Sequence, residues 1–180
     1  MIDIVARRYA DALFQIGEED NLTGKLYKEM NDIIDIIQSS NELNKALKSP
    51  LVSRQEKKNL LRAILRGQAN NYVQNFLFVL VDKDRMSSLI NISEAYKELL
   101  NKKNNVLEGK VITAIALDNK EIEELQLKLS SKYNKNIVLE NIVDENILGG
   151  VLVRLGNEEI DGTVLNRLNS LKQQLSQVIS

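Results

Sequence analysis

The sequence predicts an α+β protein, in which an N-terminal six-helix bundle is followed by a small C-terminal mixed sheet with helices. Up to residue 104, glycine occurs only at positions 17, 24 and 67, and apolar residues recur at helical spacing. Residues 106–180 contain five further glycines and runs rich in Val and Ile, which are typical of strands. We therefore expect two domains, 1–104 and 105–180, within the 180 residues of the chain.

Six segments with helical periodicity account for the first domain. The first ends near Gly17, Pro50 interrupts the chain after the third, and Ser53 with Glu56 forms a capping box at the start of the fourth. Short loops between these segments favour a compact bundle. The expected helices are Asp3–Ile16, Leu22–Gln38, Glu42–Lys48, Ser53–Arg66, Asn70–Val81 and Met86–Lys103.

The second domain is expected to follow the order strand, helix, three strands, helix. Asp118 and Glu121 form another capping box, and Gly156–Asn157 makes the turn between the last two strands. The expected strands are Lys110–Leu117, Asn136–Val143, Val151–Leu155 and Glu159–Ile160, with helices before Tyr133 and after Thr163.

Two glycine-containing motifs flank the last two strands. Gly149–Gly150 does not continue into a phosphate-binding fingerprint, so we interpret the pair as a place of close backbone approach or positive φ. Asp161–Gly162–Thr163 is expected to form the turn into the last helix. In that turn Asp161 or Thr163 would cap the helix, and Gly162 would adopt the tight backbone angle.

The composition argues against most catalytic chemistry. The chain has no histidine and no cysteine, which removes the commonest general base, the commonest metal ligand and every thiolate. Lys plus Arg is 24 and Asp plus Glu is 25, so net charge gives no bulk attraction to nucleic acid or anionic membrane. We expect no catalytic, cofactor-binding or metal-binding residues. The longest apolar run, Phe76–Val81, is far short of the ~20 residues that span a bilayer, and we expect a cytoplasmic protein.

The first helix carries more apolar surface than one packing face requires. Its apolar and small residues cover an arc of roughly 160°, whereas about 100° is enough to dock a helix on a core. Either the helix is wedged between two neighbours of its own bundle, or the excess contacts a second body. The residues on the arc are Ile2, Val5, Ala6, Tyr9, Ala10, Ala12, Leu13, Ile16 and Gly17.

For the fifth and last helices, too, the apolar residues could be covered either by the chain itself or by a partner. Apolar residues surround the fifth helix, and a groove between it and the first, filled by an amphipathic helix from a partner, accounts for both excesses. The last helix has a four-three spacing that favours covering the small sheet, with a coiled-coil contact as the alternative. Its stripe consists of Val164, Leu168, Leu171, Leu175 and Val178.

Two sequence motifs resemble those of a known protein family. The segment Ala6–Phe14, ARRYADALF, resembles the opening helix of the delta subunit of bacterial F-type ATP synthases, the family of the mitochondrial oligomycin-sensitivity-conferring protein. The segment Gly149–Val164, GGVLVRLGNEEIDGTV, with Arg167–Leu168 after it, resembles that family's C-terminal signature. The stretch from Phe76 to Tyr96 resembles helices 5 and 6 of the family, so the resemblance spans nearly the whole chain.

The resemblance implies a non-catalytic stator subunit of the peripheral stalk. The N-terminal domain would grip N-terminal helices of the alpha subunits, and the C-terminal domain would hold the C-terminal helices of the b subunits, so that the catalytic head resists rotor torque during proton-driven ATP synthesis. The protein would lie at the cytoplasmic face of the cell membrane, attached through the complex. By their positions in the matching segments, the resemblance assigns Tyr9, Ala12 and Val79 to the groove between the first and fifth helices. The helical wheel adds Val5, Leu13, Phe76 and Leu80 as their neighbours. The structural motif comprises Gly149, Gly150, Gly156, Asp161, Gly162 and Thr163.

Other functional classes remain open on the residues alone. A non-catalytic helical adaptor could bind another protein or RNA, and RNA binding would weaken steeply with salt. An enzyme using only carboxylates would need a cleft with two opposed acids, of which the sequence shows no sign.

Overall fold

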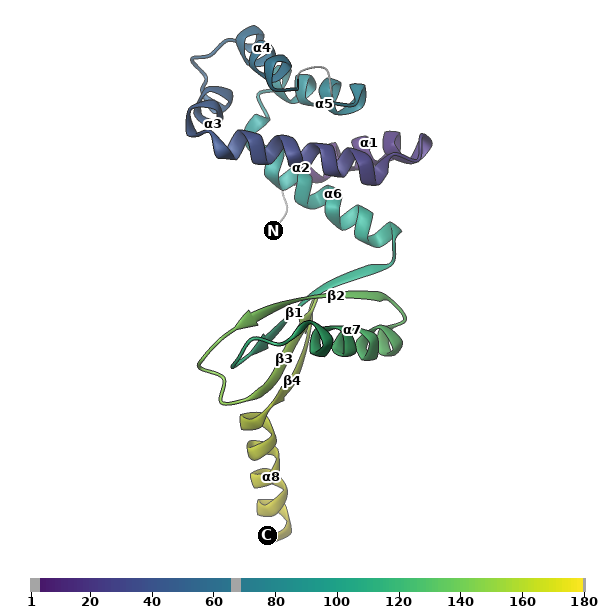
Figure 1. The fold of residues 1–180 in the computed structure, drawn as a ribbon, viewed down its shortest axis with the longest axis vertical. Helices are drawn as coiled ribbons and strands as arrows, with labels where there is room; N and C mark the ends of the chain where they lie inside the picture. The colour runs from purple at the N-terminus through teal and green to yellow at the C-terminus, as the bar shows by residue number, and fades with distance from the viewer. Residues whose placement is uncertain (1–3, 66–68, 180) are drawn as a thin grey trace. The chain divides into compact units, whose positions relative to one another are not determined.

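The computed structural model describes residues 4–65 and 69–179, and the side chains up to residue 173. The chain divides into two compact units, Met1–Leu100 and Asn101–Ser180. The first described unit is helical, and the second combines helices with a four-stranded sheet, so the fold is α+β (Figure 1).

The helices of the first unit follow the expected order with small shifts at their ends. The short helix η1 precedes α6, where one continuous helix was expected, and the expected positions Asp3, Arg66 and Gly67 lie outside the described residues. The elements are α1 (Ile4–Glu19), α2 (Thr23–Ser39), α3 (Asn41–Lys48), α4 (Arg54–Leu65), α5 (Asn71–Asp82), η1 (Met86–Ser88) and α6 (Leu89–Lys103).

Gly17 does not end the first helix, contrary to expectation. It is buried inside α1, where an added Cβ would lie 3.1 Å from the hydroxyl oxygen of Tyr96. The chain leaves the helix at Asn21, which has a φ of 56°, and the backbone N–H of Leu22 donates to the Gly17 carbonyl at 2.7 Å. Asn can adopt this left-handed conformation, so Gly17 serves packing and Asn21 serves termination.

An aromatic cluster forms part of the helical core. Tyr96 is fully buried between Phe14 and Tyr27, with ring centroids 5.3 Å and 6.1 Å away. Its hydroxyl donates to the carbonyl of Thr23 at 3.0 Å, which satisfies the one polar atom of the ring. Burial raises the pKa of Tyr96 to about 12. The cluster therefore fixes α6 against both α1 and α2.

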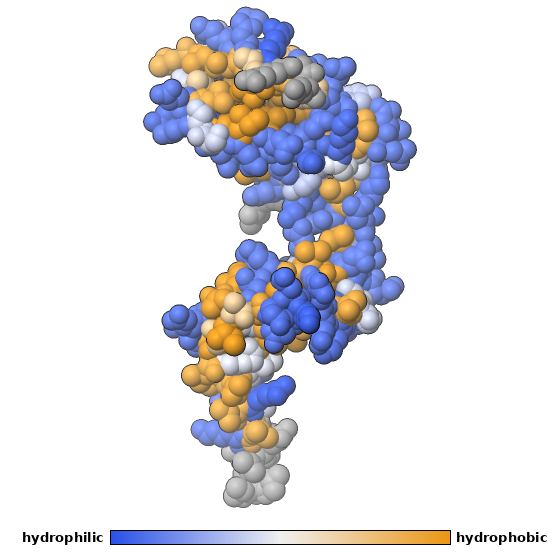
Figure 2. All heavy atoms as spheres, viewed as in Figure 1, coloured by the Kyte–Doolittle hydropathy of each residue, from blue (hydrophilic) through white to orange (hydrophobic). Residues whose placement is uncertain are grey.

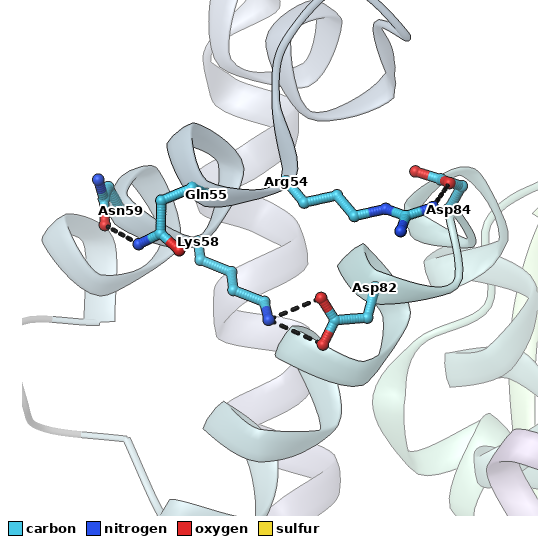
Figure 3. A network of polar contacts seen from close by, with 6 residues as sticks. All are labelled: Arg54, Gln55, Lys58, Asn59, Asp82 and Asp84. Atoms are coloured by element: carbon cyan, nitrogen blue, oxygen red, sulfur yellow. Dashed lines mark hydrogen bonds and ion pairs between the residues drawn. The ribbon is translucent and has the colours of Figure 1, made fainter.

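Polar contacts tie α4 to the end of α5 (Figure 3). The Arg54 guanidinium lies 2.6 Å from an Asp84 carboxylate oxygen, and the Lys58 ammonium lies 2.6 Å from one of Asp82. The capping box predicted at the start of α4 is confirmed, because the backbone N–H of Ser53 donates to the Glu56 carboxylate at 2.9 Å and the Glu56 N–H donates to the Ser53 hydroxyl at 3.3 Å.

The second unit has the strand order β2-β1-β3-β4, in which β1 runs parallel to β2 and antiparallel to β3. Helix α7 packs on the sheet, and the capping box predicted at its start is present. The strands are β1 (Val106–Thr113), β2 (Asn136–Val143), β3 (Gly150–Leu155) and β4 (Glu158–Thr163), and the helices are α7 (Asn119–Tyr133) and α8 (Val164–Ile179). The buried core consists of Val111, Leu129, Ile137, Leu139, Val153 and Leu155.

Strand β1 begins and ends four residues before the predicted Lys110–Leu117. Gly109 lies inside the strand, close to the neighbouring strand β3. A larger residue would not fit there, because an added Cβ would be 2.7 Å from the backbone oxygen of Arg154. After the strand, the N–H of Leu117 donates to the side chain of Asn141 at 2.9 Å, which holds this segment outside the ladder. The bounds of β1 therefore depend on its close contact with β3. The presence of a glycine in the sequence does not by itself predict that contact.

The outer edge of β2 is closed by side chains from α7. The backbone N–H of Ile137 donates to the Ser130 hydroxyl at 3.1 Å, and that of Leu139 donates to the Gln126 amide oxygen at 2.8 Å. Unpaired donors on an edge strand are a template for association with other chains. These two contacts occupy two donors of that edge without adding a strand.

Candidate partner-binding surfaces

Helix α1 presents an apolar strip that the rest of the described bundle leaves at the surface. Its buried side chains occupy an arc of about 100°, which is the width expected for docking on one core. Val5, Tyr9, Ala12 and Ile16 occupy the adjoining arc of about 60° and are half-buried or exposed. The described bundle therefore does not enclose this strip between two neighbouring helices. The buried side chains are Ala6, Ala10, Leu13, Phe14 and Gly17.

The apolar residues around α5 divide into three groups. One group is the buried face formed by Val73, Phe76, Leu77, Leu80 and Val81. Phe78 forms the second, because its ring lies 5.8 Å from the Lys58 ammonium and 5.1 Å from the Arg62 guanidinium carbon on α4. The third is Tyr72 and Val79, which are 37% and 45% exposed.

Helices α1 and α5 contact each other beside these two strips. The rings of Tyr9 and Phe76 are in edge contact with centroids 6.4 Å apart. The Tyr72 hydroxyl donates to an Asp20 carboxylate oxygen at 2.6 Å, and this hydrogen bond raises the pKa of Tyr72. We call the combined surface the α1–α5 face, which comprises Val5, Tyr9, Ala12, Ile16, Tyr72 and Val79.

The residues predicted for the groove separate into surface and floor. Val5, Tyr9, Ala12 and Val79 lie on the α1–α5 face. Leu13, Phe76 and Leu80 are only 2%, 9% and 0% exposed, so they form the core beneath it. A helical wheel identifies an apolar arc but not the part that the bundle itself covers. Ile16 and Tyr72 were absent from the predicted site, although the periodicity already placed Ile16 on the arc and Tyr72 among the apolar residues of its helix.

The glycine pair of the C-terminal motif does what the sequence predicted. Gly149 and Gly150 have φ values of 145° and 81°, and an added Cβ on Gly150 would lie 2.5 Å from the Gly162 carbonyl oxygen. Gly156, with a φ of 57°, opens the two-residue turn between β3 and β4. The motif therefore brings the backbones of β3 and β4 close together at the base of the last helix.

Asp161–Gly162–Thr163 is a strand segment, where a turn was expected. Gly162 pairs with Val151, and its φ lies outside the left-handed region. Its small size serves the close approach of Val151, whose backbone oxygen would lie 3.1 Å from an added Cβ. The helix cap is Thr163, whose hydroxyl accepts from the N–H of Asn166 at 3.3 Å. The Asp161 carboxylate accepts from the Thr163 N–H at 2.9 Å, and its hydrogen bonds with Thr163 lower the pKa of Asp161.

Helix α8 does not cover the sheet, contrary to expectation. It starts directly after the last residue of β4, so no connecting loop allows the chain to fold back onto the strands (Figure 1). Its described residues are all exposed, and Figure 2 shows apolar surface along the start of the helix. The stripe residues Leu175 and Val178 lie outside the described side chains. Val164, Leu165, Leu168 and Leu171 are 43–56% exposed.

The described residues contain no helix that is both long and apolar enough to cross a membrane. The same residues contain no group of three or more acidic side chains placed to hold a metal ion.

Comparisons with known proteins cover the whole chain. Residues 5–175 match the family model described as ATP synthase delta (OSCP) subunit. The chain is 56% identical to ATP synthase subunit delta of Clostridioides difficile over 100% of both chains, and 40% identical to that of Alkaliphilus metalliredigens over 99% of both. A chain of the Toxoplasma gondii mitochondrial ATP synthase hexamer shares the fold with a TM-score of 0.71 at 22% identity, covering 96% of this chain and 98% of that one. The protein therefore belongs to the ATP synthase delta (OSCP) subunit family.

Proposed function

We propose that this chain is the stator connector of an F-type ATP synthase, which links the alpha subunits of the catalytic head to the stalk formed by the b subunits. Full-length similarity to delta subunits supports the assignment to this complex. In such a motor the rotor applies torque to the head, and the connector holds the head still during proton-driven synthesis. The task requires slow dissociation, which well-packed apolar contacts supply.

The observation that carries the proposal is the α1–α5 face. An apolar strip of about 60° on α1, continued by Tyr72 and Val79 on α5, matches the surface that an amphipathic helix covers when it lies across two helices. We propose that an N-terminal helix of an alpha subunit binds here, with the N-terminal six-helix bundle as its support. Leu13, Phe76 and Leu80 hold the floor of this face in place.

The exposed stripe of α8 supports the second attachment. Val164, Leu165, Leu168 and Leu171 leave more apolar surface than a solvated helix needs, and their spacing suits helix-to-helix packing. We propose that the C-terminal unit holds the C-terminal helices of the b subunits. Both attachments are non-catalytic, and the chain reaches the cytoplasmic face of the membrane through these partners alone.

A bridging experiment tests the proposal. The full chain is mixed with a peptide copying the N-terminus of the alpha subunit and with a soluble C-terminal fragment of the b subunit, and binding of each is measured alone and together. We expect both to bind at once, Tyr9→Asp to weaken only the alpha peptide, and Leu168→Asp to weaken only the b fragment. Competition between the two ligands, or a loss of both through one substitution, would contradict a connector with two separate attachments.

A further inference from the structure

A cavity of about 110 Å³ lies where α4 meets the chain segments after α3 and α5. Its volume is well above the ~10–15 Å³ that one water requires, so a small polyatomic ligand fits. Its apolar wall consists of Leu47, Val81 and Met86. The polar groups on its lining come from α3, α4, the segment between α5 and η1, and η1 itself, so a ligand there would contact all of them.

Lys57 gives this cavity its charge. The residue is only 5% exposed, and among the described residues its ammonium makes no hydrogen bond and no ion pair. In the described part of the chain no fully buried side-chain nitrogen or oxygen lacks a partner, so the ammonium keeps some access to solvent, and Lys57 is one of the residues that line the cavity. A largely buried and unpaired cation is costly, and an anion beside it removes much of that cost.

The other charges on the lining favour an anion. Lys48 and Ser87 also line the cavity, and both are exposed residues that can supply a second ammonium and a hydroxyl donor. Asp84 is the acidic residue of the lining, and its carboxylate already lies 2.6 Å from the Arg54 guanidinium (Figure 3). That ion pair, with Lys57 nearby, lowers the pKa of Asp84 and keeps it ionised. The lining therefore has two lysines and one carboxylate, and Arg54, outside the lining, already pairs with that carboxylate.

We propose that this cavity binds a small tetrahedral oxyanion of the phosphate type through Lys57, Lys48 and Ser87. The site lies apart from the α1–α5 face and requires neither an alpha nor a b subunit. Bound anion would tie α3 and η1 to α4, because the three donors come from these three elements. It would therefore stabilise the N-terminal unit against unfolding.

Thermal unfolding of the full chain in inorganic phosphate, against potassium chloride at equal ionic strength, tests the site. We expect the midpoint to rise by several degrees with saturating phosphate, since a ligand at ten times its Kd adds RT ln 11 of stability. Lys57→Met should lose this increment while melting at or above the wild-type temperature without phosphate. Lys58→Met is the matched control, because Lys58 pairs with Asp82 and lies outside the lining, and it should keep the increment.

Calorimetric titration of the wild-type chain with inorganic phosphate provides a reading that does not depend on variants. A parallel titration with glycerol 3-phosphate separates two sources of the same group: binding of both indicates a phosphoryl group on a larger molecule, and binding of inorganic phosphate alone indicates the free ion. Equal melting in phosphate and chloride, no titration heat from either ligand, or an unchanged increment in Lys57→Met would overturn the proposal.

Discussion

Val79→Asp is expected to weaken binding of a peptide from the N-terminus of the alpha subunit by about 30-fold or more. Val79 is 45% exposed, so roughly half of its side chain remains to be covered by a partner. Full burial of a valine contributes about 1.5–3 kcal/mol, and the remaining fraction therefore contributes about 0.7–1.4 kcal/mol. An aspartate at this position must also lose its hydration without gaining a partner, which brings the total above about 2 kcal/mol.

The same substitution should leave the fold intact. Val79 makes no part of the buried face of α5, and exposed substitutions of this kind usually change stability little. The new carboxylate would lie one turn before Asp82, which costs about 0.2–0.5 kcal/mol. It would also lie near the helix C-terminus, which costs about 0.3–1 kcal/mol. Circular dichroism should therefore show unchanged helicity at 25 °C.

Fluorescence anisotropy with a labelled peptide measures the affinity. Gln15→Asp provides the matched control, because Gln15 is exposed on α1 outside its apolar arc and gains the same charge. We expect Gln15→Asp to bind within a factor of about two of wild type. Unchanged affinity in Val79→Asp, or an equal loss in Gln15→Asp, would refute the assignment of the α1–α5 face.

Further predictions concern the two units separately. Gly150→Ala should destabilise the C-terminal unit by more than about 2 kcal/mol in a denaturant titration, because its Cβ would clash with backbone at a φ of 81°; an unchanged midpoint would contradict the close approach. The double variant Gln126→Ala, Ser130→Ala should self-associate in size-exclusion chromatography by exposing the β2 edge, and a monomer would argue against that role. The Ser53 hydrogen bonds lower the pKa of Glu56, so the stability that they add is present above the unfolded pKa and is lost as pH falls through the folded one. The difference in free energy of unfolding between wild type and Ser53→Ala should therefore decrease toward acid pH. A difference that increases toward acid pH would contradict the role of these hydrogen bonds.

Local chemistry explains which features the sequence could predict. The capping boxes at Ser53 and Asp118 each lie within four consecutive residues, so no distant contact decides them. Strand β2 matches its predicted bounds, and Asn134 just before it adopts a left-handed conformation, with φ 51°, that asparagine tolerates. Each of these features is fixed by residues adjacent in the chain.

Features that depend on distant contacts were missed. Glycine is needed at position 17 because the side chain of Tyr96 packs against it, and at position 162 because strand β3 lies close to it. A glycine in a sequence is instead usually taken to predict a turn. The cations that pack on Phe78 come from α4, so its exposure could not be judged from α5 alone. For the candidate site, periodicity located the apolar arc, and only the packed bundle separated Tyr9 on the face from Leu13 beneath it.

The most direct test of the central claim is to map by NMR where a peptide from the N-terminus of the alpha subunit binds on the full chain. The account predicts that amide signals of α1 and α5 shift on titration, strongest around Tyr9, Ile16 and Val79, while those of β1–β4 stay unchanged. Shifts confined to other helices, or none at saturating peptide, would show that the exposed apolar surface of α1 and α5 does not hold the head.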